Sequence, residues 1–401
     1  MKTKLVYVLP VYDPESAEHT YHMRSFLQAV AKSVDVLVII ERTRGSLDFT
    51  ELVQDGHLAV YPRRLQVPVL KSLETLLVMV WARLRGYRRF YTHYSMSAGI
   101  LSALVTRILG GVSYYWSCGQ MMLFVPRHVR SLHDLRAKFR NQWLLGLTLH
   151  LVHHLVTCNA TMARYYSKHY HLKPSGIHVM PNWVNLARFS NLPDRAALRA
   201  ELGWPQDKKV VLFLHRLSER KGAHEIVPVA LELFRGNPLL VSQYCFVVAG
   251  GGPYRQKLED EIRTAGLAEQ FKVIGWVPNR EVPKFFAAAD VYMMPSVEEA
   301  FGRTLLEAMA SGCAITAMDV GGVRDGLSPA QQRFLVPEAD GQAMAAALEL
   351  FLTDDALRNE LAIEGRRHVQ DYSEDKTVRA YVLLIAEEDA SQPLSGDPQK
   401  N

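Results

Sequence analysis

The sequence predicts an α/β protein made of two doubly wound, Rossmann-like domains. Its 401 residues are too many for one ordinary compact domain. Short β-branched and aliphatic runs alternate with longer amphipathic stretches, which is the pattern of parallel strands joined by crossover helices. A polar, proline-marked stretch at residues 183–208 interrupts the pattern once, and the pattern then restarts. We therefore place a domain boundary there.

The first half of the chain contains seven short apolar runs typical of strands. In order they are KLVYVLP (4–10), VDVLVII (34–40), HLAVYP (57–62), RRFYTHYS (88–95), SYYWSC (113–118), HLVTCN (154–159) and IHVMPN (177–182). Helical patterns lie between most of them, so we expect a parallel sheet with crossover helices in a first domain at residues 1–185.

The second half contains five more runs of the same kind. They are VVLFLH (210–215), YCFVVAGG (244–251), FKVIGWV (271–277), VYMMPS (291–296) and CAITAMD (313–319). These runs are almost continuously apolar, as strands are when helices cover both faces of the sheet. We expect a second domain at residues 186–371, with ligands beyond the carboxyl ends of its strands.

Charge is divided unevenly along the chain. The net charge is +5, but residues 1–185 hold 22 Lys and Arg against 10 Asp and Glu, while residues 186–401 hold 24 against 31. A basic first half indicates an anionic partner, which is a membrane surface, a phosphorylated substrate or nucleic acid. Nucleic acid fits worst, because the basic segments lack interleaved aromatic residues and no known binding module is present.

The cysteines and the longest apolar stretch set further expectations. The four cysteines lie far apart and none is in a close pair that could hold a metal, so we expect buried free thiols in a reducing, cytoplasmic compartment. The most membrane-like stretch, residues 67–84, contains Lys71, Glu74 and Arg83 and falls short of the roughly 18 uncharged apolar residues of a span. We expect no transmembrane segment.

Two loops of the second half have the composition of anion or ligand sites. In HRLSERKG, Arg216 and Lys221 follow a predicted strand, and Gly222 lets the chain turn into a helix, so both cations can face one anion. In VVAGGGPYR, Gly251 and Gly252 allow the backbone to approach a ligand closely. A solvated charged loop and purely structural glycines remain the alternatives.

The stretch MPSVEEAFGRTLLEAMASGCAI carries the strongest signal. Glu299 lies in the loop after a predicted strand, and Glu307 lies about one turn into the next helix. The amides expected to face the same point as Glu299 are those of Phe301, Gly302, Arg303 and Thr304. Carboxylates accept hydrogen bonds from paired hydroxyls, so this arrangement suits a polyol or a sugar, and it holds no nucleophile.

These stretches resemble the retaining glycosyltransferases of the GT-B fold, family four. The matching pieces are RLSERKG, GGGPYR, GWVPNREVPKFFAAADVYMMPS and EEAFGRTLLEAMASG, in the family's order, with MPNWVN similar to the start of its linker. The resemblance covers residues 177–325. It implies two Rossmann-like domains facing each other across a cleft, with a final helix at about residues 372–388 crossing back to the first domain.

The resemblance also implies roles for the site residues. Arg216 and Lys221 would clamp the donor diphosphate, Glu299 and the amides of residues 301–304 would hold the transferred sugar, and Glu307 would hold the ribose hydroxyls. The backbone around Val277 would contact the nucleobase. Retention in this family is explained by front-face attack, with stabilisation of the leaving diphosphate by the two cations as the main catalytic contribution.

The implied reaction moves a hexosyl unit from a nucleoside-diphosphate sugar, a UDP-sugar or GDP-mannose, to a hydroxyl of a glycan or lipid-linked acceptor. No metal and no cofactor is expected, because side-chain cations and helix dipoles would neutralise the diphosphate and the sequence has no Asp-x-Asp between strands. A catalytically silent nucleotide-sugar binding protein is the alternative from another class. A nucleotide-sugar epimerase fits less well, because the first domain shows no acid and base carboxylates.

The first domain departs from the family's pattern at two places. The loop PVYDPESAEHTYHM has no glycine, and Cys118 stands where many relatives have a histidine. His93 and His19 could line the acceptor side instead, although both also have an ordinary packing interpretation. His215 replaces a glycine before Arg216 and is interpreted mainly as packing.

Basic charge is concentrated in two segments of the first domain. Residues 63–89 hold seven basic residues and one acid, and residues 127–140 hold five and one. A basic amphipathic helix with Trp81 fits docking to anionic lipid headgroups, so a peripheral position on the cytoplasmic face of a membrane is expected. The alternative, which we favour for the apolar side of this helix, is that it packs on the sheet while its arginines extend to water.

Overall fold

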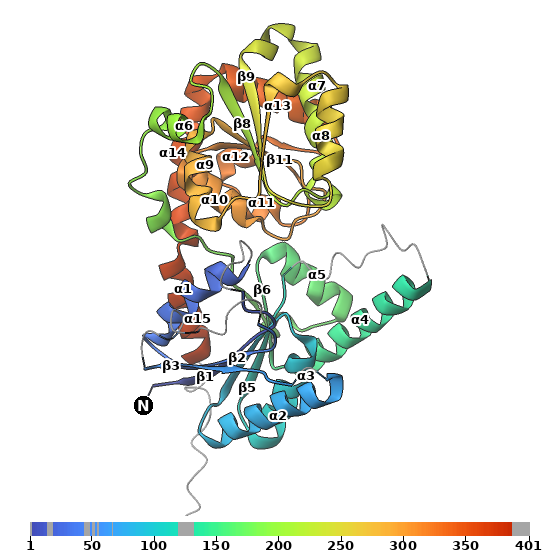
Figure 1. The fold of residues 1–401 in the computed structure, drawn as a ribbon. Coiled ribbons are helices and arrows are strands. Elements are labelled where there is room, and N and C mark those ends of the chain that lie inside the picture. The colour runs from blue at the N-terminus through green and yellow to red at the C-terminus, as the bar shows by residue number, and fades with distance from the viewer. Residues whose placement is uncertain are drawn as a thin grey trace, which may run out of the picture.

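The computed structural model describes residues 2–13, 19–43, 49, 53, 56–65, 67–118 and 132–386. Two parallel sheets form the centres of two domains that are stacked one above the other (Figure 1). We call the part built on the first sheet the front domain and the part built on the second sheet the back domain. The predicted α/β class with two doubly wound domains is confirmed.

The front sheet has seven strands in the order β3-β2-β1-β4-β5-β6-β7. They are β1 (Lys4–Leu9), β2 (Asp35–Ile40), β3 (Leu58–Pro62), β4 (Arg89–His93), β5 (Val112–Trp116), β6 (His154–Thr157) and β7 (Ile177–Val179). Every neighbouring pair is parallel. Six of them lie within the runs predicted from sequence, and β5 begins one residue before its run, at Val112.

Successive side chains of β1 and β2 point to opposite faces of the sheet, and a separate layer of helices covers each face. The helices that follow the strands are α1 (His19–Ala31), α2 (Pro68–Leu84), α3 (Met96–Leu109), α4 (Leu132–Leu151) and α5 (Ala160–Tyr170). Tyr7 and Val38 point to the face that α1 covers, whereas Val6 and Ile39 point to the face that α2 and α3 cover. Successive strand residues thus pack against opposite layers, which buries both faces of the sheet.

The back sheet has six parallel strands in the order β10-β9-β8-β11-β12-β13. They are β8 (Lys209–Leu214), β9 (Tyr244–Ala249), β10 (Phe271–Gly275), β11 (Val291–Met294), β12 (Ala314–Met318) and β13 (Leu335–Val336). The first five match predicted runs. The sixth, β13, was not predicted, because two residues on an edge give no periodic pattern.

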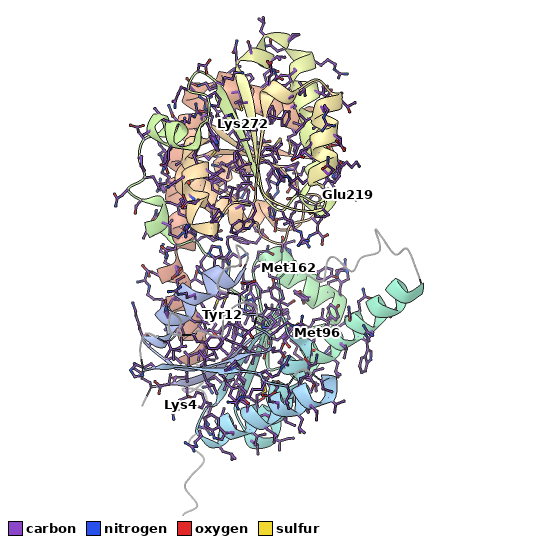
Figure 2. All side chains as sticks on the ribbon, in the orientation of Figure 1. Lys4, Tyr12, Met96, Met162, Glu219 and Lys272 are labelled. Carbon is purple, nitrogen blue, oxygen red and sulfur yellow. A yellow bond between two sulfur atoms is a disulfide. The ribbon has the colours of Figure 1, made fainter. Side chains whose placement is uncertain are left out.

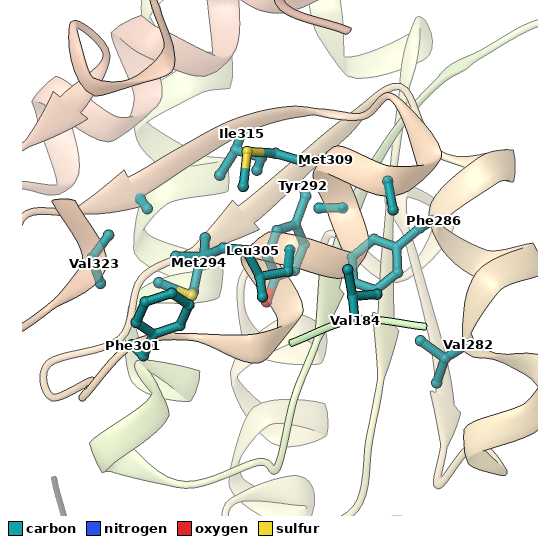
Figure 3. Close-up of a cluster of buried hydrophobic side chains, with 14 of the residues drawn as sticks. Val184, Val282, Phe286, Tyr292, Met294, Phe301, Leu305, Met309, Ile315 and Val323 are labelled. Carbon is teal, nitrogen blue, oxygen red and sulfur yellow. The ribbon is translucent and has the colours of Figure 1, made fainter. Parts of the chain in front are cut away.

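Helices on both sides cover the back sheet. They are α6 (Arg195–Leu202), α7 (Ile226–Gly236), α8 (Arg255–Thr264), α9 (Val282–Ala288), α10 (Arg303–Ser311), α11 (Val323–Gly326), α12 (Pro329–Gln332), α13 (Gly341–Thr353) and α14 (Asp355–His368). Figure 3 shows the apolar cluster under α10, in which Leu305 and Met309 pack against Tyr292 and Ile315 of the sheet. This packing fixes the helix that carries Glu307.

The chain crosses between the domains twice, and the two crossings lie side by side. Val184 forms a parallel bridge with Ser373, with its amide 3.0 Å from the carbonyl of Tyr372. The last helix, α15 (Glu374–Ala386), then packs against α1 on the front sheet (Figure 1). Tyr381 of α15 is buried edge-on against Tyr91, at a centroid distance of 4.9 Å.

The cysteine prediction was wrong for two of the four residues. Cys118, just after β5, and Cys158, just after β6, form a disulfide with a Cα–Cα distance of 5.5 Å. The two strands are neighbours in the sheet, so residues 40 positions apart in sequence meet where both strands end. Spacing along the chain could not reveal this. Cys245 and Cys313 are buried free thiols, as expected.

We expected the apolar side chains of α2 to pack on the sheet, and only some of them do. Met79 and Ala82 are fully buried against the sheet, but Leu77 is 59% exposed and Leu84 is 76% exposed. Among the described residues, no helix has the length and hydropathy needed to span a bilayer.

Candidate functional site

A cavity of about 1040 Å³ lies between the domains, at the carboxyl ends of the strands of the back sheet. Residues of the back domain form most of its lining. Front-domain residues and the crossing segment complete it, through His22, Tyr94, Cys118 and Asn182. In Figure 2, Glu219 marks the edge of the back domain and Met162 the facing edge of the front domain. The cavity contains most of the residues selected from sequence.

Two glycine turns of the back domain fit their surroundings so closely that a side chain would not fit. Gly222 has φ 73°, and a Cβ there would lie 1.8 Å from the carbonyl oxygen of Pro295. At Gly252, with φ 156°, a Cβ would lie 2.2 Å from the carbonyl oxygen of Leu217. These glycines therefore let the loops after β8, β9 and β11 pack together at one edge of the sheet.

Lys221 and Glu299 form an ion pair inside the cavity. Lys221 Nζ lies 2.5 Å from Glu299 Oε2, and both side chains are about nine-tenths buried. Burial alone would raise the pKa of Glu299. The charge of Lys221, together with hydrogen bonds from Lys221 and the Ala300 amide, outweighs burial and holds the pKa of Glu299 below its ordinary value. Glu299 is therefore an ionised carboxylate whose charge Lys221 balances.

Arg216 and His215 lie beside this pair at the end of β8. Arg216 is exposed and lines the cavity, so the structure brings it to the same wall as Lys221. The Nε2 atom of His215 lies 3.9 Å from Glu299 Oε2. Burial and the nearby Lys221 charge lower the pKa of His215 to about 3, so this ring is neutral at physiological pH. It does not add a positive charge for a diphosphate.

Glu307 is the fifth residue of α10 and is buried at the back of the cavity. Burial raises its pKa to about 7, and the charges of Arg188 and Arg303 only partly oppose this. Such a carboxylate is half protonated near neutral pH, because nearby charges and hydrogen bonds do not fully offset the cost of burying its negative charge. Ligand hydroxyls that donate to it would supply the missing hydrogen bonds.

The start of α10 differs from the expectation in detail. The helix begins at Arg303, after Gly302 with φ 77°, so the unpaired amides of its first turn begin at residue 303 rather than 301. All four residues 301–304 line the cavity. The side chains of three of them are used inside the protein: Phe301 packs near Tyr372, Arg303 donates to the carbonyl of Trp183, and Thr304 accepts from Tyr292.

Several cavity residues were missed by the sequence analysis. Trp276 is 58% exposed and stands next to Val277, which also lines the cavity together with Gly251 and Gly252. Asn182 has a buried Oδ1 atom without a hydrogen-bond partner. The signal for Trp276 was an aromatic residue near the end of the predicted run 271–277, directly after the last residue of β10. Asn182 was visible only as a polar residue at the end of the run 177–182.

The front-domain predictions were less accurate. Cys118 lines the cavity, but as half of a disulfide. His93 is not a lining residue: it is 2% exposed, stacks on Trp116 at 4.2 Å, and Nδ1 is hydrogen-bonded to Tyr7. These contacts agree with the packing interpretation of His93. His19 is the first residue of α1, and its side chain lies outside the described residues, as do residues 14–18 of the first loop.

Within the described ranges, no group of three or more His, Cys, Asp or Glu side chains is placed to hold a metal ion. The described charged residues that line the cavity are the cations Arg216, Arg220, Lys221 and Arg303 and the carboxylates Glu298, Glu299 and Glu307. Such a cavity can bind an anionic group at the cations and hydroxyl groups at the carboxylates. Among the described lining residues, no serine is shown hydrogen-bonded to a histidine, and Cys118 is half of a disulfide.

Two family profiles match the chain, one for each domain. Residues 194–368 match "Glycosyl transferases group 1", and residues 18–188 match "Glycosyltransferase Family 4". Similar proteins include the D-inositol 3-phosphate glycosyltransferase of Kineococcus radiotolerans, 32% identical over 57% of this chain and 56% of that one. The 2-deoxystreptamine N-acetyl-D-glucosaminyltransferase of Streptomyces fradiae is 33% identical over 44% of this chain and 42% of that one. The matched stretches thus span about half the length of these relatives.

Solved structures extend the likeness over nearly the whole chain. Sucrose-phosphate synthase from Thermosynechococcus elongatus has a TM-score of 0.77 and 21% identity, covering 98% of this chain and 100% of that one. HepE from Anabaena, solved in complex with UDP, has a TM-score of 0.71 and 20% identity, covering 97% and 100%. At such identities these matches establish the arrangement of the two domains.

Proposed function

The chain belongs to the family 4 glycosyltransferases of the GT-B fold, and on this premise we propose that it is a retaining hexosyltransferase. The donor is a nucleoside-diphosphate sugar, a UDP-sugar or GDP-mannose. The acceptor is a hydroxyl of a glycan or of a lipid-linked molecule. One observation carries the proposal: Arg216, Lys221, Glu299, Glu307 and the start of α10 line one cavity between the domains.

In this proposal the donor lies along the back wall of the cavity. Arg216 and Lys221 bind the diphosphate, and Glu307 accepts hydrogen bonds from the two ribose hydroxyls. The backbone at Val277 contacts the base, and the exposed ring of Trp276 adds a stacking surface beside it. HepE, solved with UDP and with UDP-glucose, supports a uridine donor by fold likeness.

Lys221 has two partners in the proposed cycle. Without donor it neutralises Glu299 at 2.5 Å, which keeps a buried carboxylate charged. An incoming diphosphate competes for the ammonium group, and Glu299 is then available to accept hydrogen bonds from sugar hydroxyls. In the bound state the diphosphate pairs with Lys221, and the sugar hydroxyls supply the hydrogen bonds that Glu299 then needs as a buried carboxylate.

The bond changes follow from this placement. The bond between the anomeric carbon and the phosphate oxygen breaks, the cations stabilise the charge that develops on the diphosphate, and the acceptor hydroxyl attacks from the same face. The departing phosphate oxygen takes the acceptor's proton, so retention needs no side-chain base. This agrees with the state of His215, the histidine beside Lys221 and Glu299, because burial and the Lys221 charge lower its pKa to about 3 and keep it neutral. Neither a metal nor a cofactor has a part in this proposal.

We also propose a cytoplasmic location, peripheral on an anionic membrane surface. The buried free thiols Cys245 and Cys313 fit a reducing compartment, whereas the Cys118–Cys158 bond is less common there. A catalytically silent binding protein remains the competing function. It would bind a nucleotide sugar in the same cavity without transferring the sugar.

A panel of UDP-, GDP- and ADP-sugars tests the proposal. Donor binding is measured by thermal shift, and hydrolysis or transfer is followed by release of the nucleoside diphosphate. We expect one donor to raise the melting temperature and to be turned over, with the α-anomeric configuration kept in the product. Binding without turnover for every acceptor offered would favour the silent protein, and no binding would reject the function.

A further inference from the structure

Helix α2 presents a continuous apolar stripe to solvent. Leu70, Leu73, Leu77, Trp81 and Leu84 recur every three or four residues, so they lie on one side of the helix, and they are 43% to 76% exposed. The opposite side, with Met79 and Ala82, already fills the front sheet's core. This stripe is therefore not needed for packing within the chain.

The end of α3 continues this apolar surface. Arg83 of α2 donates to the carbonyl of Gly110, which caps α3, so the two helix ends lie next to each other. Ile108, in the last turn of α3, is 77% exposed. We call the surface formed by the α2 stripe and Ile108 the basal surface. It lies at the end of the front domain that points away from the back domain (Figure 1).

A cationic hollow of about 260 Å³ opens where α2 ends. It is lined by Lys2, Thr3, Lys4, Arg85, Gly86, Arg88 and Arg89, none of which is acidic. Lys4 Nζ donates to the carbonyl of Arg85 at 3.1 Å, which ties the start of β1 to the end of α2. Arg85 also lies over the ring of Trp81, at 5.3 Å from the centroid, so the hollow and the apolar stripe are contiguous.

Negative charge is almost absent from this part of the chain. Between residues 63 and 113 the sequence has one acid, Glu74. It is buried, and it accepts hydrogen bonds from the amides of Arg64 and Leu65 and from Tyr61. The remaining polar groups at the edge of the basal surface, such as Lys71, Arg83, Arg85 and Arg107, are basic.

We propose that the basal surface docks the protein on an anionic lipid bilayer, with the apolar stripe at the acyl boundary and a lipid phosphate in the cationic hollow. Aliphatic side chains and a tryptophan flanked by arginines are the composition of interfacial helices. A solvated protein rarely exposes so long an apolar stripe without a partner. The inference deepens the proposed membrane location and does not depend on glycosyl transfer.

Charge decides against a second copy of the chain as the partner. A two-fold interface would bring the same surface of both copies together, so cations would face cations, while Asp35, whose amide donates to Thr3 beside the hollow, is already hydrogen-bonded to His57. An anionic bilayer provides apolar contact and negative charge together. Each Lys or Arg near such a surface contributes roughly 1 kcal/mol to binding at physiological salt.

Vesicle flotation with the full-length protein tests the docking. Vesicles of phosphatidylcholine with about 30% phosphatidylglycerol should carry the protein, vesicles of phosphatidylcholine alone should not, and high salt should weaken binding. Arg85→Gln with Arg88→Gln should weaken binding about 30-fold, since two cations at roughly 1 kcal/mol each are removed. Leu77→Glu with Trp81→Glu should abolish it, because two charges would enter the apolar boundary.

Matched variants of the back domain provide the controls. Arg263→Gln with Arg280→Gln removes two exposed cations, and Ile363→Glu places a charge at a 69% exposed apolar position. Both should bind vesicles like the unchanged protein. All variants should keep their melting temperature and their rate of donor hydrolysis, which separates a failure of docking from a failure of the enzyme.

Three results would overturn the docking proposal. Absence of vesicle binding at low salt would reject it directly. Protection of the hollow by inorganic phosphate, without any vesicle binding, would show a site for a free anion instead. A dimer in sedimentation that Leu77→Glu dissociates, with no vesicle binding, would show that the basal surface is a contact between two copies.

Discussion

The walls of the cavity that come from the two domains differ in how their residues are fixed. On the back wall, Lys221, Glu299 and Gly252 belong to loops that directly follow strands, and close backbone contacts hold those loops together. On the front wall, Cys118 and Tyr94 also follow strands, but they are fixed by partners from other strands or loops. Tyr94 donates to the carbonyl of Cys118, and Cys118 is bonded to Cys158.

This difference shows that residues fixed within a local stretch of the chain can be selected from sequence, whereas residues fixed by partners from distant strands cannot. The back-wall residues and their glycine turns occur within short stretches of the chain, so composition and spacing identify them. The front wall depends on which strands become neighbours. It is also where this chain departs from its relatives' pattern, at Cys118 and in the first loop.

Of the variants considered, Lys221→Ala should cause the largest loss of activity and stability, because it removes a buried cation from the back wall. Loss of an ammonium group from the leaving diphosphate should lower kcat/KM about 1000-fold. It should also leave Glu299 buried and unpaired, at a cost of roughly 3 kcal/mol in unfolding free energy. Progress curves of nucleotide release and urea unfolding measure the two effects. Lys272→Ala, at an exposed site on β10, is the control and should change neither.

The double variant Lys221→Ala with Glu299→Gln separates the two roles of the ion pair. Without a buried charge, most of the lost stability should return, but activity should stay low. Activity close to that of the unchanged protein in either variant would mean that the back wall does not hold the donor diphosphate.

Breaking the disulfide should test the front wall. Because Cys118 and Cys158 enclose a loop of 40 residues, their cross-link should stabilise the fold by about 4 kcal/mol on loop-entropy grounds. Reductant should therefore lower the melting temperature of the unchanged protein. The double variant Cys118→Ala with Cys158→Ala should already melt at that lower temperature without reductant. The double variant itself should not respond to reductant. If reductant leaves the unchanged protein as stable as before, the front wall is not cross-linked in solution.

Glu307→Gln should give an effect that depends on pH. Burial raises the pKa of Glu307 to about 7, so the folded state holds this proton more tightly than the unfolded chain does. The protein should therefore lose stability as pH rises from about 4.5 to about 7, by roughly 3 kcal/mol for this group. The glutamine variant lacks this loss, so its advantage in melting temperature should grow between pH 5 and pH 8.

The same variant should bind the donor more weakly at pH 8, where Glu307 is ionised in the unchanged protein and can accept two hydroxyl hydrogen bonds. Thermal shift with and without UDP-sugar measures this. Equal donor affinity of both proteins at pH 8 would remove Glu307 from the ribose site.

His93→Asn should give the smallest effect and should mark the border of the front wall. His93 stacks on Trp116 and is hydrogen-bonded to Tyr7 beneath the cavity, so its loss should cost about 1 kcal/mol of stability. The KM values for donor and acceptor should stay within about threefold, as is usual for changes that do not touch a ligand. A much larger change in the acceptor KM alone would place the histidine in the acceptor site after all.

Most of the fold followed from the sequence, because buried strands such as residues 244–249 are continuous apolar runs with glycine at their ends. Strand β13 could not be predicted, since its two residues are too few to show a repeating pattern of apolar side chains. Arg216 and Lys221 were selected from the loop after β8 and Glu307 from the start of the helix after β11, and the structure places all three on one cavity. Pairing of Lys221 with Glu299 was not predicted, because it joins residues 78 positions apart through the packing of two loops.

The bridge between Val184 and Ser373 limits how the two domains can move. Both connections leave the back domain at this one place, so a change in the angle between the sheets bends both of them together. A rotation of one domain against the other would therefore bend the chain at this bridge, and it would also have to break the hydrogen bonds of Asn159 with Ala300 and of Thr161 with Asp325. If the domains moved apart in this way, the side of the cavity farthest from the bridge would widen most. Substrates could then enter from that side while the side near the bridge stayed closed.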